Sequence, residues 1–194
     1  MKLSITHQES YSRGELLLRS FFGFIYIMIP HGFLLFFCSI WSAVLAFITF
    51  WTVLFTGKFP EGIFAYQVKL MNWSLRLMAT MYNLVDGYPA NGLSGTSDKV
   101  SLEVEMPGDV SRGLVILRAF FGPIYVMIPH GFCLAFRMIG GSVLMFLAWW
   151  VVLFTGSYPE NWHAYQVGTF RWQTKVNLYM GYFTDEYPGF TGKE

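Results

Sequence analysis

The chain has 194 residues, of which 54% are hydrophobic and only 13% are charged, and its mean hydropathy is +0.43. This composition is too apolar and too poor in charge for a soluble domain of this length, so it predicts an integral membrane protein. The formal net charge is +1 and no dense run of lysine or arginine occurs, which excludes nucleic acid as a partner.

The sequence repeats itself after 99 residues without a gap. Ser12-Arg13-Gly14 returns as Ser111-Arg112-Gly113, Trp51 as Trp150, and Tyr66-Gln67-Val68 as Tyr165-Gln166-Val167. This periodicity predicts a tandem duplication, with a first repeat over residues 1–95 and a second over residues 96–194. The N-terminus lacks the apolar core of a signal peptide, so we expect the first hydrophobic segment to direct insertion.

Each repeat opens with a short segment in which apolar and polar residues alternate. Leu3 and Ile5 carry this pattern in the first repeat, and Val100, Leu102 and Val104 carry it in the second. Alternation with a period of two is typical of a half-exposed strand, and the two strands are expected to be able to pair.

The next element of each repeat is predicted to be a transmembrane helical hairpin, over residues 14–56 and 113–155. Ser12 and Ser111 stand where a helix N-cap is expected. Pro30-His31-Gly32 and its copy at residues 129–131 predict a tight turn, because proline interrupts the helical hydrogen bonds and glycine permits a reversal. An uncharged stretch from residue 33 to 55 follows, and Gly57 is expected to cap its end.

The basic residues decide between two topologies. Hairpins leave nearly all lysines and arginines on one side of the membrane, which predicts a multi-pass protein of the bacterial inner membrane with both termini cytoplasmic. The alternative is a single kinked span in each half, which would make the two repeats inverted.

An amphipathic helix is predicted after each hairpin, over residues 61–85 and 160–184. In the first, apolar residues such as Phe64, Val68 and Leu75 recur at helical spacing while Lys69 and Arg76 form a polar stripe. This pattern, with Trp73 and Trp172 among the aromatic residues, predicts a helix in the headgroup plane that contacts lipid or a partner protein. The expected fold class is therefore an all-α integral membrane protein of two pseudo-symmetric repeats, with short terminal strands.

His31 and His130 are the candidate cofactor-binding residues. They occupy equivalent positions, so symmetry could bring them together on a haem or a metal. The alternative is a turn histidine that hydrogen-bonds a carbonyl at a helix end, and this alternative is preferred because neither has a carboxylate or cysteine nearby. The prediction is accordingly no cofactor and no metal.

Three arginines lie at membrane depth. Arg19 and Arg118 fall within apolar helices, and Arg137 lies near the proposed outer turn. An intramembrane charge is a candidate contact for a lipid phosphate or a partner subunit. The alternative for Arg19 and Arg118 is that they extend toward the cytoplasmic headgroups.

No catalytic residue is predicted. Glu61, Glu160, Asp86 and Asp185 are expected to have structural roles at helix ends, with Asp86 meeting Arg76 or a strand amide. No motif of a hydrolase, an NTPase or a zinc enzyme occurs in the sequence.

Each repeat resembles a bacterial membrane family described only as domain of unknown function 4389. The motifs that carry the resemblance are Ser12-Arg13-Gly14, Ile29-Pro30-His31, the segment from Leu54 to Pro60, and the Asp-x-Tyr-Pro motif from Asp86 to Pro89. The family usually has Arg-Trp, as in Arg171-Trp172, where the first repeat has Asn72-Trp73. The resemblance implies a fold and a bacterial membrane setting, and it implies no mechanism.

The sequence thus predicts a non-catalytic membrane scaffold or accessory subunit that packs against larger integral membrane proteins. Large aromatic residues and methionines are abundant at lipid depth while polar residues that line a pathway are scarce. The alternative is a small transporter, channel or lipid-handling protein with a pathway between the repeats. A third reading is haem or metal binding through the two histidines.

Overall fold

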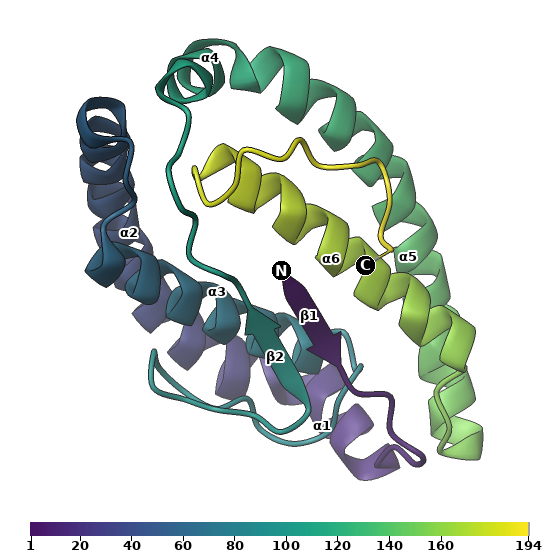
Figure 1. Cartoon of the computed structure of the whole chain (residues 1–194). Coiled ribbons are helices and arrows are strands. Elements are labelled where there is room, and N and C mark those ends of the chain that lie inside the picture. The colour runs from purple at the N-terminus through teal and green to yellow at the C-terminus, as the bar shows by residue number, and fades with distance from the viewer. Residues whose placement is uncertain (194) are drawn as a thin grey trace.

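The computed structural model describes residues 1–193 and is mostly helical (Figure 1). The last residue of the second predicted repeat, Glu194, lies outside the described residues. In chain order the elements are β1 (Lys2–Ile5), α1 (Arg13–Gly23), η1 (Phe24–Met28), α2 (Ile29–Thr56), α3 (Glu61–Met81), β2 (Val100–Glu103), α4 (Arg112–Gly122), η2 (Pro123–Met127), α5 (Ile128–Thr155) and α6 (Glu160–Met180).

The predicted strands are confirmed and they pair with each other. β1 and β2 are antiparallel, and Leu3 lies opposite Leu102, the residue 99 positions later. The buried side chains of this pair, with those of Ile5 and Val100, pack toward the helices, while Lys2 and Glu103 are exposed. The two-stranded sheet therefore covers one side of the molecule (Figure 1). Its polar side chains face outward.

The predicted tight turns are wrong. The chain is helical without interruption from Arg13 to Thr56 and from Arg112 to Thr155, so Pro30 and Pro129 lie in the first turn of a helix. Each proline directly follows a π-helical turn, so its missing N–H leaves a carbonyl of that turn without a helical donor. A π-helical turn precedes each proline, in which the Ile29 N–H donates to the carbonyl of Phe24, five residues back.

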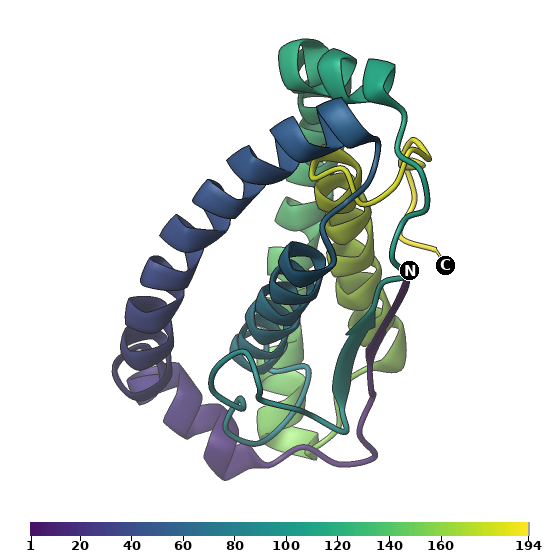
Figure 2. The same ribbon diagram turned by 60° about the vertical axis from the view of Figure 1, so that its left-hand side comes forward.

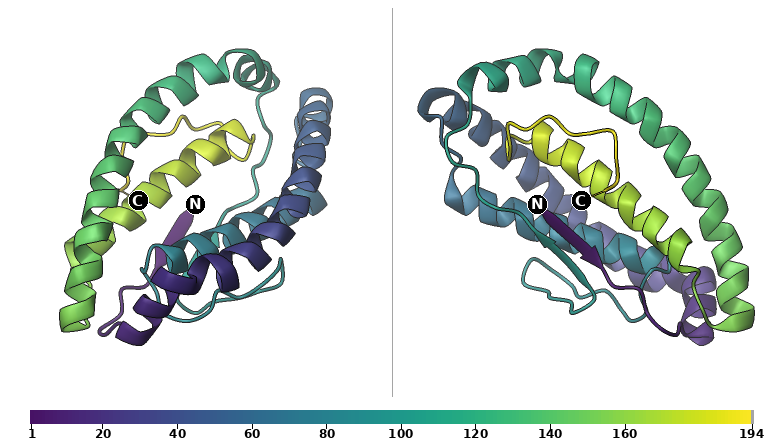
Figure 3. Two further views of the ribbon diagram at one scale, coloured as in Figure 1. Left: turned by 180° about the vertical axis from the view of Figure 1, so that it is seen from behind. Right: turned by 45° about the vertical axis from the view of Figure 1, so that its right-hand side comes forward.

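Each 44-residue helix consequently bends into an arch instead of reversing as a hairpin. In Figure 2 the bend of the first arch is the part farthest from the strands, and the right panel of Figure 3 shows the second arch curving away from them. The arch ends lie on the strand side, where the Tyr11 N–H donates to the Gly156 carbonyl and the Val110 N–H to the Gly57 carbonyl. The start of each arch thus meets the end of the other.

The predicted helix caps are confirmed where they can be checked. The Ser12 hydroxyl accepts a hydrogen bond from the Glu15 N–H, and Ser111 does the same for Leu114. Gly57 ends α2 in the left-handed conformation, with φ of 75°.

Helices α3 and α6 end one turn earlier than predicted, at Met81 and Met180. Asn83 (φ 57°) and Tyr182 (φ 68°) adopt the left-handed conformation that closes a helix. The Leu84 N–H then donates to the Ala79 carbonyl and the Asn83 N–H to the Thr80 carbonyl, which is a Schellman motif.

Helices α3 and α6 form the middle of the molecule, between the arches and the strands (Figures 1 and 2). Buried residues such as Trp73, Leu77 and Ala79 lie on several faces of α3. The prediction of a helix with one free face in the headgroup plane is therefore corrected, because these helices pack against a long helix on one side and the strand layer on the other.

Candidate functional site

The bends of the two arches are held by tyrosines from the Asp-x-Tyr-Pro motif. A proline has no N–H, so the carbonyl four residues before it loses its helical donor. For Pro30 that carbonyl belongs to Tyr26, and it accepts a hydrogen bond from the Tyr88 hydroxyl at 3.3 Å. For Pro129 it belongs to Tyr125, and the Tyr187 hydroxyl donates to it at 3.0 Å. Two motifs that are far apart in the sequence therefore form one structural unit.

The aspartates of the same motif bind the arginines of the arches. Asp86 accepts a hydrogen bond from the Arg19 guanidinium at 2.9 Å and from the Ser12 N–H at 2.7 Å. Asp185 pairs with Arg118 and accepts from the Ser111 N–H at 2.7 Å. The expectation that Asp86 meets Arg76 is wrong, since Arg76 donates to the carbonyls of Ala90 and Gly92.

The arginines at the start of the arches point into the protein. Arg19 is 5% exposed and also donates to the Val85 carbonyl at 2.8 Å, while Arg118 is fully buried and its guanidinium lies 4.5 Å from the Tyr179 ring centroid. Neither side chain extends outward from the molecule, because both guanidinium groups are buried. A buried guanidinium needs a counter-ion and hydrogen-bond acceptors, and Asp86 and Asp185 are the counter-ions.

Arg137 lies on α5 and is partly buried. Its Nε donates to the Thr169 hydroxyl at 2.8 Å, and its guanidinium stacks 4.2 Å from the ring centroid of Tyr165. The Tyr165 hydroxyl returns a hydrogen bond to the Arg137 carbonyl at 3.0 Å. Arg137 thus ties α5 to α6 within the second half.

His31 and His130 each bind the tryptophan of their own half. The Trp73 indole N–H donates to Nδ1 of His31, and that of Trp172 to Nδ1 of His130, both at 2.9 Å. Since an Nδ1 that accepts carries no proton, each neutral imidazole has its proton on Nε2. All four side chains are buried. Trp73 and Trp172 therefore lie in the core and not at the lipid surface where the sequence placed them.

The geometry gives no shared histidine site. Nε2 of His130 lies 3.2 Å from the Tyr187 hydroxyl, and the Phe190 ring stacks on the imidazole at 4.0 Å. No group of three or more histidine, cysteine, aspartate or glutamate side chains within residues 1–193 is placed to hold a metal ion. His31 and His130 are thus seated as separate core residues, each with its own aromatic neighbours.

The two arches carry an exposed apolar surface. Almost all exposed large apolar side chains lie on the two arches, including Phe21, Phe24, Phe33, Phe47 and Phe55 on the first. Only 11% and 17% of the most apolar stretches of the two arches are buried, whereas the core helix of a soluble protein is mostly buried. Both helices are long and apolar enough to enter a membrane.

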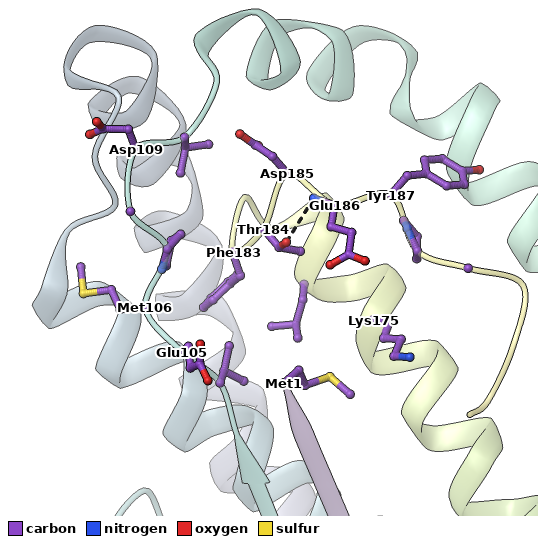
Figure 4. A pocket seen from close by; sticks show the side chains of 17 residues that line it. Met1, Glu105, Met106, Asp109, Lys175, Phe183, Thr184, Asp185, Glu186 and Tyr187 are labelled. Atoms are coloured by element: carbon purple, nitrogen blue, oxygen red, sulfur yellow. Dashed lines mark hydrogen bonds between the residues drawn. The ribbon is translucent and has the colours of Figure 1, made fainter. Parts of the chain in front are cut away.

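A hollow lies on the strand side of the molecule. It has a volume of about 620 Å³ and lies between the segment 104–110, the loop 183–189 and Lys175 of α6 (Figure 4). Glu105, Asp109 and Glu186 surround it, and the Glu186 N–H donates to the Thr184 hydroxyl at 3.1 Å. Asp185 is also at its rim but is engaged by Arg118. Its walls hold no set of ligands for a metal ion.

The first half binds its aspartate with a glutamine that the second half lacks. Gln8 there accepts from the Asp86 N–H at 2.8 Å, whereas its counterpart 99 positions later is Pro107. Gln8 also donates to the Asp86 carboxylate at 3.2 Å. Pro107 can make neither of these two hydrogen bonds with Asp185.

A second difference between the halves is a buried group of titratable residues around Leu84. His163 and Tyr158 of the second half meet His7 and Tyr11 there, with 5.1 Å between the His7 and His163 ring centroids. Burial lowers the pKa of His163 to about 4, and burial also raises the pKa of Tyr158 and Tyr11. The counterparts of His163 and Tyr158 are Phe64 and Phe59, which pack on Phe183.

The sequence reasoning missed the roles of Tyr88 and Tyr187, although it used their motif. A signal was present, because any proline within a helix frees a carbonyl that must find another donor. It also missed Asn83 and Tyr182, whose left-handed backbone conformation no sequence pattern announced.

Residues 117–191 match a family model described as "Domain of unknown function (DUF4389)". This match confirms the family resemblance for the second repeat, in which Arg171-Trp172 lies. No curated protein and no solved structure matches the chain.

Proposed function

We propose, taking the chain as a member of this family of unknown function, that it is a non-catalytic membrane protein which serves as a scaffold or accessory subunit. Its two arches enter the membrane from one side and its strand layer faces water. In bacteria this places it in the inner membrane, with the strand side toward the cytoplasm.

One observation carries the proposal: exposed large apolar side chains lie almost entirely on the arches. Those elsewhere are Met1, Met78, Tyr88, Met106, Tyr187 and Phe190. A monomeric soluble protein rarely exposes a continuous apolar surface of this extent, and lipid is the solvent that covers it without penalty. The uncharged stretch between Arg19 and Lys58 supports the same placement.

The arch geometry favours insertion from one side over a straight span. Both ends of each arch are hydrogen-bonded beside the strands, which carry Lys2 and Glu103 on their outer face. A span would carry one arch end, with the charged residues around it, across the hydrocarbon core. The N-terminus and the last described residues also lie on the strand side (Figure 2).

We also infer that the two halves are duplicated units related by a pseudo-two-fold axis. The antiparallel register pairs Leu3 with its own counterpart Leu102, as a two-fold axis through that pair requires. The bonds from Tyr11 to Gly156 and from Val110 to Gly57 are also counterparts of each other.

A labelling experiment tests the topology. The native thiols, Cys38 and Cys133, are first replaced by alanine, and single cysteines are then introduced at Glu9, Lys58 or Ile25. We expect a membrane-impermeant maleimide to label Glu9→Cys and Lys58→Cys from the same side. Ile25→Cys, at the bend and 62% exposed, should be labelled from neither side until detergent is added. Labelling of Glu9→Cys and Lys58→Cys from opposite sides would establish a span and refute insertion from one side.

The scaffold role has its own test. Purification in mild detergent from native membranes should recover other integral membrane proteins in fixed stoichiometry with the chain. Recovery of the chain alone at every detergent concentration would contradict this role and leave the membrane topology unaffected.

A further inference from the structure

The two halves differ where the start of one arch meets the other arch. Between α1 and α5 lies a pocket of about 540 Å³, within the range of roughly 300–1,000 Å³ that is usual for ligand sites. Its lining residues are Arg19, Ser20, Met81, Asn83, Met145, Phe146, Trp149 and Trp150. The last four of these residues belong to α5, and Phe146 and Trp150 are exposed on the apolar surface of the arches.

The matching interface, between α4 and α2, is filled by a tyrosine. Tyr182 is the counterpart of Asn83, and its ring lies 6.3 Å from that of Phe50 and 5.6 Å from the Arg118 guanidinium. Both residues have a positive φ, so asparagine and tyrosine occupy the same left-handed backbone conformation. This conformation is more strained for tyrosine than for asparagine. The packing of the tyrosine ring in the interface offsets that strain.

Two polar atoms of the residues that line the pocket lack hydrogen-bond partners. Nε of Arg19 and Oδ1 of Asn83 are both buried and have none within the described part of the chain. One is a donor and the other an acceptor, and an unpaired buried polar group destabilises the folded state. A ligand with a hydroxyl group could donate to Asn83 and accept from Arg19.

The charge of Arg19 is already balanced. Asp86 lies 2.9 Å and Glu15 3.6 Å from its guanidinium nitrogens, so two carboxylates face one cation. An anionic headgroup would therefore meet net negative charge beside Arg19, and a neutral headgroup would not.

We infer that this pocket binds a single-chain lipid with an uncharged hydroxyl headgroup, of the monoacylglycerol type. The hydroxyl lies between Arg19 and Asn83, and the acyl chain runs along Met145, Phe146, Trp149 and Trp150 toward the membrane. The inference rests on the proposed insertion of the arches, because the acyl chain then enters from the lipid phase.

Native mass spectrometry of the full chain in detergent tests this inference, with 1-monooleoylglycerol as the probe and oleoyl lysophosphatidate as the anionic comparison. The wild type should bind one monooleoylglycerol and bind the lysophosphatidate at least tenfold more weakly. Asn83→Tyr, which copies the filled interface, should lose the site.

Liposome flotation separates this test from that of membrane insertion. Asn83→Tyr should float with liposomes as the wild type does, so that loss of lipid binding concerns the pocket alone. Unchanged binding by Asn83→Tyr, or preference of the wild type for the lysophosphatidate, would overturn the inference. If Asn83→Tyr does not fold, Asn83→Gly decides, because glycine keeps the left-handed backbone and removes only the acceptor. Binding of monooleoylglycerol at least tenfold weaker than in the wild type supports the pocket, and unchanged binding refutes it.

Discussion

The Tyr187 hydroxyl donates a hydrogen bond to the backbone carbonyl of Tyr125 at 3.0 Å. Pro129, four residues after Tyr125, cannot supply the N–H that this carbonyl would have in a regular helix. A loop from the end of the chain therefore completes the helix that the proline leaves open. The same arrangement joins Tyr88 to Tyr26 in the first half.

This relationship predicts a coupling between the tyrosine and the proline. Tyr187→Phe should lower the free energy of unfolding by about 1 kcal/mol, because the carbonyl loses its donor. In a Pro129→Ala background the alanine N–H can bond the carbonyl, so the same substitution should cost less. Chemical denaturation of the four proteins in detergent measures the coupling energy, and a value of zero would show that the tyrosine does not act through the carbonyl.

The arginine–aspartate pairs should differ in strength between the halves. Asp185→Asn leaves the buried Arg118 without its counter-ion, which should cost roughly 3–5 kcal/mol. Asp86→Asn should cost less, because Glu15 remains 3.6 Å from Arg19 whereas the counterpart of Glu15 is Leu114. Thermal unfolding of the two variants gives the order. Equal losses would mean that Glu15 contributes nothing to the first pair.

The indole–imidazole bonds predict a second asymmetry. Trp73→Phe removes the donor to His31, whose Nε2 also has no partner among the described residues, and should cost about 1–3 kcal/mol. Trp172→Phe should cost less, since His130 keeps the Tyr187 hydroxyl at 3.2 Å. Urea denaturation of both variants checks this order, and a greater loss for Trp172→Phe would contradict it.

The buried His163 predicts a loss of stability in acid. Its pKa is about 4 in the folded protein against 6.5 ordinarily, so the unfolded chain binds more protons between these pH values. Stability should therefore fall by about 3 kcal/mol as pH decreases from about 6.5 to about 4.

His163→Phe supplies the matched control for this pH effect, because the counterpart residue in the first half is Phe64. The variant keeps His7, which faces His163, so the difference between the two pH profiles isolates His163. Melting temperatures measured across this range should decline less steeply in the variant, and parallel profiles would exclude His163 as the cause.

Local sequence patterns predicted the elements whose determinants lie close together in the chain. The alternation at Leu3 and Ile5, the cap at Ser12 and the glycine at residue 57 each depend on a few neighbouring residues, and all were confirmed. Pro30 was misread because a proline in the first turn of a helix and a proline in a turn have the same local sequence. The helix is distinguished from the turn by the Tyr88 hydroxyl, which is distant in the sequence and donates to the Tyr26 carbonyl that Pro30 leaves free.

The arginines illustrate the same limit for the candidate site. An arginine in an apolar helix predicts either a headgroup contact or a buried partner, and local spacing does not separate these outcomes. The partner of Arg19 is Asp86, 67 residues away, and only the folded chain brings them together. The pocket beside Asn83 was likewise beyond local reasoning, because the residues that line it come from distant parts of the sequence.

The pairing of Leu3 with Leu102 places two matching interfaces in one polypeptide. In a homodimer of a single repeat, any substitution would change both interfaces together, so both would be open or both would be filled. Covalent linkage removes that constraint. One interface can be filled by Tyr182 while the other, with Asn83, keeps a pocket. A single polypeptide can thereby combine a structural interface with one that binds a ligand.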